Sequence, residues 1–336
     1  MDRTECIPVC RHQHRIRDIN SKLLRGKRGN PTRPPSCSLI GDALTGNPEY
    51  DLRNSQRFSF SLIFVLTGAG MSTASGIPDY RSEGVGLYAR GDKRPIQHGD
   101  FLKSEKNRQR YWARNYVGWP KFSSVLPNSG HKILSDWEKR KKISWLVTQN
   151  VDALHHKAGS RNVTELHGCS HRVECLQCGS GMMRHRLQEL IADMNPHFHE
   201  ESLDIAPDGD VQLSDYQVRS FQVPSCPSCG GVLQPQIVFF GANVAKPIVM
   251  FVFRKVEECD SVLVLGSSLE VYSGYRFVVA ASKRELPIAI VNIGPTRAED
   301  LATIKIRGQC MDVLERTDAL LAISYLEVNM PRVGQI

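Results

Sequence analysis

Four cysteines lie in two close pairs, and their spacing is typical of a zinc site. Cys175 and Cys178 form one Cys-x-x-Cys pair, Cys226 and Cys229 form the second, and a glycine follows each pair directly. Two thiolate pairs on tight turns supply the tetrahedral ligand set of structural Zn²⁺. Disulfides and a redox dithiol are the alternatives, but nothing in the chain resembles a secretory signal and the two pairs occur together. We predict structural zinc, because the four thiolates leave no open position for catalysis.

A second group of residues is suited to binding a dinucleotide. Gly68, Ala69 and Gly70 follow the apolar run 62–66. A buried strand that opens into small residues lets the backbone approach a pyrophosphate, and a following helix offers free N–H groups. Alone, the cluster fits a tight turn that needs glycine equally well, because it is not the usual G-x-G-x-x-G. Similar clusters at other predicted strand ends favour the nucleotide site: Gln149, Asn150 and Asp152, then Gly266, Ser267 and Ser268, then Asn292, Ile293 and Gly294.

These clusters need elements that place them at one edge. Continuous apolar runs, typical of strands buried on both faces, occur at 62–66, 143–147, 236–240, 261–265 and 288–292. Predicted helices alternate with them at 107–116, 131–141, 247–258 and 273–284. The alternation predicts an α/β fold with a Rossmann-like, doubly wound parallel sheet. Ligands bind such sheets beyond the carboxyl ends of the strands.

The alternation breaks where the cysteines lie, which predicts a smaller zinc-binding domain over residues 168–235. The Rossmann-like domain is then discontinuous, over 58–167 and 236–325, and 1–57 form an N-terminal extension that is disordered or a targeting segment. Because 47 residues separate the cysteine pairs, we expect the acidic tract 200–215 to loop out. His167 lies at the junction. A lone histidine is at least as often structural, but clefts form between domains, and an imidazole with a pKa near ~6.5 suits a general base.

Composition and charge exclude some classes of protein. Hydrophobic residues make up 41% and charged residues 23% of the 336, which is typical of a globular chain. Residues 1–57 hold eleven Lys and Arg against six Asp and Glu, so they carry +5 of the net charge of +8 and the remaining 279 residues carry +3. We therefore expect no nucleic-acid partner, and no apolar run approaches the ~20 residues of a membrane span. Acidic residues within 1–57 make its likeness to a mitochondrial presequence weak.

Together these motifs identify a resemblance to the sirtuins, NAD-dependent protein-lysine deacylases, from about Phe60 to Met311. Further motifs, at 84–90, 108–114, 206–210 and 271–276, are most similar to the mitochondrial class II branch. The resemblance rests on the four cysteines and on the segments 68–72, 75–81, 148–152, 166–168, 239–241, 266–269 and 292–294.

The resemblance implies where the ligands bind. NAD is the co-substrate, with its pyrophosphate over Ala69 and Gly70 and its adenosine side at Gly266, Ser267 and Asn292. The substrate is an acyl-lysine protein, bound by strand addition between Phe239, Phe240 and Gly241 on one side and Val271 and Tyr272 on the other. The full set of implied cofactor residues is Gly68, Ala69, Gly70, Ser72, Ser75, Asp79, Arg81, Tyr88, Gln149, Asn150, Asp152, Gly266, Ser267, Ser268, Asn292, Ile293, Gly294 and Cys310.

The resemblance also implies the reaction. Asn150 and Asp152 hold the nicotinamide amide, and His167 takes a proton from the ribose hydroxyls, so that the acyl group moves to ADP-ribose and nicotinamide leaves. The implied partners are metabolic enzymes of the mitochondrial matrix. Protein ADP-ribosylation, lipoamide cleavage and an NAD-responsive binding protein with negligible turnover stay open as alternatives.

Three positions depart from the family pattern. Ala242 stands where an acidic residue is general, the helix predicted from Pro247 is unusually apolar, and Ser273 replaces a common proline. These departures concern the choice of substrate and the rate more than the type of reaction, because His167, Asn150 and Asp152 are all present.

Overall fold

The computed structural model describes residues 62–82, 84, 86–87, 95–202 and 205–329. The predictions for the extension 1–57 and for Tyr88 lie outside these residues. In the described part of the chain, no helix is long and apolar enough to cross a membrane.

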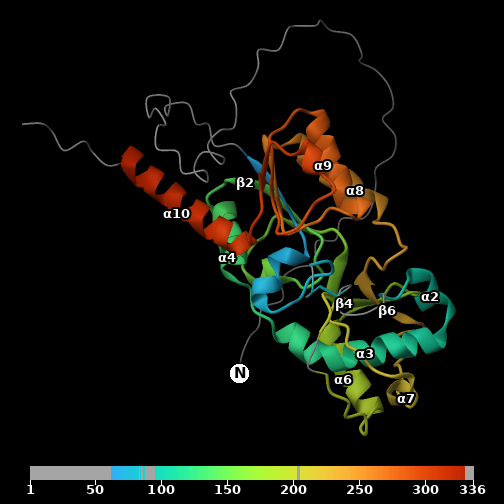
Figure 1. Cartoon of the computed structure of the whole chain (residues 1–336). Helices are drawn as coiled ribbons and strands as arrows, with labels where there is room; N and C mark the ends of the chain where they lie inside the picture. Colours follow the sequence, from blue (N-terminus) through green and yellow to red (C-terminus); the bar gives the residue numbers. More distant parts are fainter. Residues whose placement is uncertain (1–61, 83, 85, 88–94, 203–204, 330–336) are drawn as a thin grey trace, which may run out of the picture. The chain divides into compact units, whose positions relative to one another are not determined.

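Six strands form a sheet in which every neighbouring pair is parallel (Figure 1). Two of them, β7 (Ser261–Leu265) and β8 (Ile288–Val291), are buried along their whole length, which explains their continuous apolar sequence. The strand order is that of the Rossmann fold, and it reverses between β1 and β7. In sheet order the strands are β3 (Val163–Glu165), β2 (Ile143–Thr148), β1 (Ile63–Thr67), β7 (Ser261–Leu265), β8 (Ile288–Val291) and β9 (Ile304–Ile306).

Helices cover both faces of this sheet. One buried cluster joins Phe64 and Leu66 of β1 to α8 (Lys246–Glu257) and α9 (Tyr272–Lys283). A second cluster joins Val65 to α4 (Ser129–Lys139) and α10 (Cys310–Asn329). Because successive side chains of a strand point to opposite faces, the two clusters lie on opposite sides of the sheet. The doubly wound parallel sheet and the four predicted helices are confirmed.

The run 236–240 is not a strand of the parallel sheet, so that part of the prediction was wrong. It overlaps β6 (Leu233–Ile237), which pairs antiparallel with β4 (Gly168–Cys175) in a separate sheet completed by β5 (Gly181–Met183). Leu233 and Pro235 of β6 are buried, while Gln234 and Gln236 are half-buried and donate to Glu174. This alternation is typical of an antiparallel strand with one wet face.

The helix expected directly after β1 is also absent from the described residues. Two single 3₁₀ turns, Ala69–Met71 and Thr73–Ser75, follow β1 instead. Gly76 ends the second turn in the left-handed conformation, with a φ of 93°. Serine and glycine at this density favour turns over a continued helix. The next described helix is α2 (His98–Lys103).

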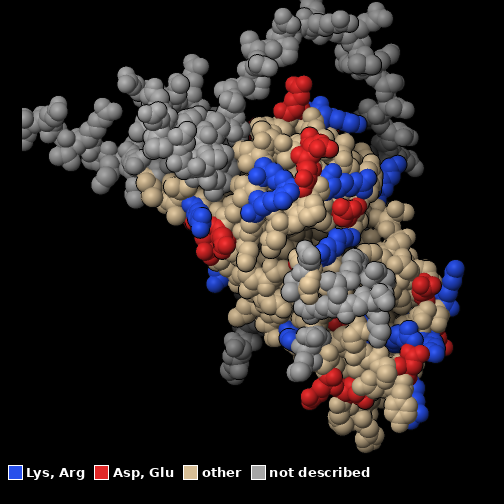
Figure 2. Space-filling model, viewed as in Figure 1, with Lys and Arg blue, Asp and Glu red and all other residues tan. Residues whose placement is uncertain are grey.

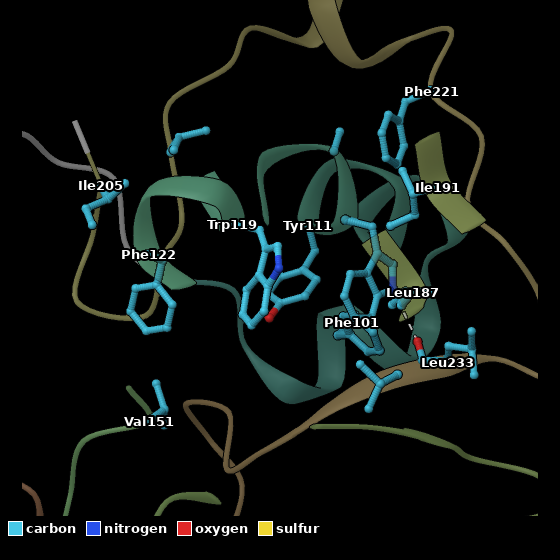
Figure 3. Close-up of a cluster of buried hydrophobic side chains, with 14 of the residues drawn as sticks. Phe101, Tyr111, Trp119, Phe122, Val151, Leu187, Ile191, Ile205, Phe221 and Leu233 are labelled. Atoms are coloured by element: carbon cyan, nitrogen blue, oxygen red, sulfur yellow. Dashed lines mark hydrogen bonds between the residues drawn. The ribbon is translucent and has the colours of Figure 1, made fainter. Parts of the chain in front are cut away.

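A cluster of aromatic side chains joins the smaller sheet to α2 and to α3 (Glu105–Ser124), as Figure 3 shows. Trp112 donates its indole N–H to the carbonyl of Leu233 at 3.2 Å. Phe101 packs against Tyr111 and Phe239, with ring centroids 5.4 and 4.9 Å apart. These contacts anchor β6 and the segment that follows it to α2 and α3. The remaining elements are α5 (Leu154–Lys157), α6 (Arg184–Met194), α7 (Asp215–Val218) and a 3₁₀ turn at Glu299–Leu301.

The described part of the acidic tract does not loop out, which corrects the expectation for 200–215. Ile205, Val211 and Leu213 are buried in the aromatic cluster. Asp210 forms an ion pair with Arg114 of α3 at 2.5 Å. The apolar residues between the acidic ones give this tract a buried face that a count of its charges misses.

Candidate active site

One cavity of about 1060 Å³ lies at the carboxyl ends of β1, β2, β7 and β8. Its volume is slightly above the ~300–1,000 Å³ range of small-molecule sites. Among the described residues, every predicted cofactor and substrate residue lines it except Ser75. The Ser75 hydroxyl accepts a hydrogen bond from the Asn128 side chain at 3.0 Å. The cavity lies at the reversal of strand order, where doubly wound sheets bind their ligands.

Glycine is required where the loops after β1 and β7 meet. A Cβ atom on Gly68 would lie 2.7 Å from the carbonyl oxygen of Gly266, and one on Gly70 would lie 2.8 Å from its Cα. Gly266 itself has a φ of 60°. The steric alternative therefore accounts for these glycines in full. What indicates a ligand is that the polar clusters after β2 and β8 lie on the same cavity.

A directed hydrogen-bond network fixes the polar residues after β2. The Asn150 side-chain amide donates to the carbonyl of Gly68 and to the hydroxyl of Ser72, both at 3.0 Å. Ser72 then donates to a carboxylate oxygen of Asp152 at 2.6 Å, and the N–H of Leu154 donates to the other at 2.9 Å. Asp152 is only 3% exposed, and burial raises its pKa above the ordinary value. Bonds to both oxygens keep this buried group in one orientation.

His167 lies on the cavity between the end of β3 and the start of β4. Its Nδ1 is 3.0 Å from the backbone carbonyl of Gln149, and its Nε2 is 2.7 Å from the hydroxyl of Ser273. A carbonyl only accepts hydrogen bonds, so we assign the ring proton to Nδ1 and a lone pair to Nε2. Burial lowers the pKa of His167 below 6.5, so the neutral ring predominates at pH 7. This geometry suits a general base that accepts a proton at Nε2.

The two predicted substrate segments lie on the same cavity. Phe239 is buried in the aromatic cluster, while Tyr272 is 57% exposed. The carbonyl of Phe240 already accepts from the N–H of His98 at 2.9 Å, and the carbonyl of Val271 accepts from the first turn of α9. Strand addition must therefore use other backbone groups of these segments.

The four cysteines of the two pairs come together at one end of the smaller sheet. Their Sγ atoms lie within 4.8 Å of one another. Cys175 and Cys229 are 3.5 Å apart, and Cys178 and Cys226 are 3.8 Å apart. Tetrahedral zinc with Zn–S bonds of ~2.3 Å needs sulfur atoms about 3.8 Å apart. The thiols are free rather than paired as disulfides, and this donor set fits Zn²⁺.

Sequence reasoning missed several polar residues of the cavity as site residues, among them Asp208, Ser273 and Arg276. Asp208 lies in the motif 206–210, but it also belongs to the tract that was expected to loop out, so it was not assigned to the site. Ser273 was visible as a departure from the family pattern, but its contact with His167 spans 106 positions. Arg276 follows it on the first turns of α9.

The fold and the site together define a class of protein. The Sir2 family model matches residues 68–273, and the chain belongs to this family, the sirtuins. The resemblance seen in the sequence is therefore confirmed.

Individual relatives support the same assignment. The chain is 57% identical over 294 residues to human NAD-dependent protein lipoamidase sirtuin-4, mitochondrial, a match that covers 86% of this chain and 94% of the relative. It is 51% identical over 270 residues to Drosophila melanogaster NAD-dependent protein deacylase Sirt4, covering 80% and 86%. The solved structure of a Sir2 with a p53 peptide and NAD⁺ is similar at a TM-score of 0.62 and 28% identity, covering 78% of this chain and 94% of that one.

Proposed function

We propose that this chain is an NAD-dependent protein-lysine deacylase that acts in mitochondria. It transfers an acyl group from lysine to ADP-ribose and releases nicotinamide. Membership of the sirtuin family and the names of the similar deacylases support the reaction, and the mitochondrial relatives support the location. One observation carries the proposal. His167 Nε2, the ring nitrogen with the lone pair, lies on the same cavity as the residues that follow β1, β2, β7 and β8.

The chemistry of the cavity wall fits NAD. The turns after β1 present backbone next to small residues, Ala69 and Gly70, which suits a pyrophosphate. Asn292 and Ser267, at the ends of β8 and β7, are assigned to the adenosine half. Asn150 and Asp152 are assigned to the nicotinamide amide, since their network holds polar groups in a sheltered part of the site. When bound, NAD supplies the nicotinamide leaving group and the ribose carbon that accepts the acyl oxygen.

The residues of this chain contribute orientation, shelter and one base. Hydrogen bonds already fix the orientation of the Asn150 and Asp152 side chains, so these residues need little reorganisation when NAD binds. His167 holds its proton on Nδ1 against the carbonyl of Gln149, so Nε2 carries the lone pair that accepts the proton of a ribose hydroxyl. A buried neutral imidazole suits that task at pH 7.

We propose acyl-lysine proteins, in particular mitochondrial metabolic enzymes, as the substrates. The human relative is named a lipoamidase, so lipoyl-lysine is one acyl group to test. No carboxylate follows Gly241, because Ala242 occupies that position and lines the cavity. On the face that Figure 2 shows, Lys and Arg lie among Asp and Glu and form no single-sign patch, which argues against nucleic acid as the partner of this face.

We keep the domain division as part of the proposal, with a Rossmann-like domain over 58–167 and 236–325 and a zinc-binding domain over 168–235. Zn²⁺ held by the four cysteines has a structural role, because they fill all four ligand positions. The aromatic cluster adds that α2 and α3 pack with the smaller sheet.

The experiment that tests the proposal combines labelled NAD with a panel of acyl-lysine peptides. The expected products are free lysine peptide, nicotinamide and acylated ADP-ribose, with one acyl group preferred. Label that stays covalently on protein without acylated ADP-ribose would indicate ADP-ribosyl transfer instead. Nicotinamide release that is equally slow in the wild type and in His167→Tyr would indicate an NAD-responsive binding protein.

A further inference from the structure

The Ser273 hydroxyl occupies the lone pair of His167 that the proposed mechanism needs. Ser273 Oγ lies 2.7 Å from His167 Nε2, and both residues line the cavity. Because Nε2 is the acceptor, the Ser273 hydroxyl must donate to it, which leaves the Ser273 oxygen with lone pairs of its own. Any proton from the substrate must therefore displace this serine or pass through it.

Two separate elements clamp the imidazole. The carbonyl of Gln149, after the end of β2, holds Nδ1, and Ser273, in the first turn of α9, holds Nε2. The two elements are in close contact, because a Cβ on Gly274 would lie 2.7 Å from the Gln149 side-chain oxygen. The ring cannot turn without losing at least one of these two hydrogen bonds.

We propose that Ser273 relays the proton from the ribose hydroxyl to His167. This inference rests on the proposed role of His167 as the base. The proline that is common at this position in the family has no hydroxyl, so the relay is a property of this chain rather than of the fold.

The proton transfer balances as follows. The ribose O–H bond breaks, and its proton binds Ser273 Oγ as the Ser273 proton moves to His167 Nε2. The electron pair of the broken bond stays on the ribose oxygen, which bonds to the acyl carbon. His167 becomes an imidazolium whose Nδ1–H stays on the carbonyl of Gln149, and Ser273 ends as a neutral hydroxyl.

The first test observes the imidazole without any substrate. Nitrogen-15 NMR of histidine-labelled enzyme free of NAD should show His167 as the Nδ1–H tautomer with a hydrogen-bonded Nε2. In Ser273→Ala the Nε2 signal should move toward that of an unbonded imidazole nitrogen, and in Ser273→Thr it should stay near the wild-type position. A Nε2 signal that is unchanged in Ser273→Ala would overturn the inference.

The second test separates two stages of the reaction. Exchange of labelled nicotinamide into NAD precedes the step that needs the base, whereas net deacylation includes it. We expect Ser273→Ala to lose about tenfold in net deacylation, the size of one hydrogen bond of ~1.4 kcal/mol, while exchange stays within about twofold. Ser273→Thr should restore deacylation, and Ser282→Ala, a matched change elsewhere on α9, should behave as wild type.

The outcomes distinguish the two proposals. Unchanged or faster deacylation by Ser273→Ala, or an equal loss of exchange and deacylation, would overturn the relay. If His167→Ala abolishes deacylation while Ser273→Ala does not, only the relay fails. If His167→Ala still deacylates, the proposed role of His167 fails as well.

Discussion

Strand β4 connects two sites of opposite kind. His167 directly precedes its first residue, and Cys175 is its last. From the first to the last of its eight residues the strand spans roughly 23 Å, since each step along a strand advances about 3.3 Å. At the first end, polar groups line a cavity, and the lone pair of His167 Nε2 accepts a hydrogen bond from the Ser273 hydroxyl. At the second end, four thiols face one another and leave no position for a substrate.

The difference shows that the two ends of one strand can serve separate purposes, catalysis at one end and stabilisation of the fold at the other. The end at His167 tolerates a buried imidazole with a lowered pKa because hydrogen bonds hold both nitrogens. The cysteine end consists of two short turns, at Gly179 and Gly230. These turns are exposed, so little apolar packing stabilises them. We infer that metal removal acts on the fold, whereas changes at His167 act on the reaction.

The largest effect should come from removing zinc. Structural zinc sites contribute ~10–16 kcal/mol of apparent binding free energy, so a chelator should unfold the smaller sheet and abolish activity together. Metal analysis should find one Zn²⁺ per chain, and Zn²⁺ added back should restore the melting temperature. A metal-free enzyme with an unchanged melting temperature would contradict the structural role.

Substitution of His167 should have the reverse signature. His167→Ala should lower the rate of acyl transfer by about 10²–10⁴-fold, the usual contribution of a general base. Its melting temperature should stay near that of the wild type, because the two residues that the ring bonds, Gln149 and Ser273, line the cavity, where water can replace the ring. Parallel measurement of kcat/KM and thermal unfolding checks both parts, and a large fall in both would place His167 with the structural residues.

The network after β2 offers a smaller test. In Asp152→Asn the side-chain NH2 must face either the N–H of Leu154, which can only donate, or the Ser72 hydroxyl, whose own proton then loses its acceptor. We expect a loss of about 1–3 kcal/mol, the cost of an unsatisfied buried group, and weaker binding of NAD by calorimetry. Asp136→Asn is the matched control, because Asp136 is 48% exposed in its ion pair with Arg140 and such pairs contribute at most about 1 kcal/mol. Equal effects of the two changes would contradict a special role for Asp152.

The smallest expected effect is a loss of stability in acid. His131 is fully buried, and burial lowers its pKa to about 4. Because an unfolded histidine binds its proton near pH ~6.5, stability should be complete above that pH and fall as the pH drops toward 4, by about 2 kcal/mol at pH 5. Gln suits this position of the Asn128 capping box, so His131→Gln should reduce the slope of unfolding free energy against pH. An unchanged slope would exclude His131 as a source of acid sensitivity.

Sequence periodicity was sufficient for most of the parallel sheet. The runs that became β1, β2, β7 and β8 are buried on both faces, so their apolar residues are continuous and easily recognised. The cysteine pairs were equally clear, since their spacing is local. Both features depend on neighbours in the chain.

Features that depend on distant contacts could not be predicted in this way. The run 236–240 was apolar enough for the large sheet, and only its pairing with β4 assigned β6 to the smaller one. The network of Ser72 with Asn150 and Asp152 joins residues 78 and 80 positions apart. The bond between His167 and Ser273 spans 106 positions, and no pattern in the sequence encodes it.

The most direct test of the central claim is to identify the product that carries the acyl group. Wild-type enzyme, NAD and the best acyl-lysine peptide should give acylated ADP-ribose in an amount equal to the nicotinamide released, and His167→Ala should give almost none. Nicotinamide released without acylated ADP-ribose, or in equal amounts by both enzymes, would contradict the account.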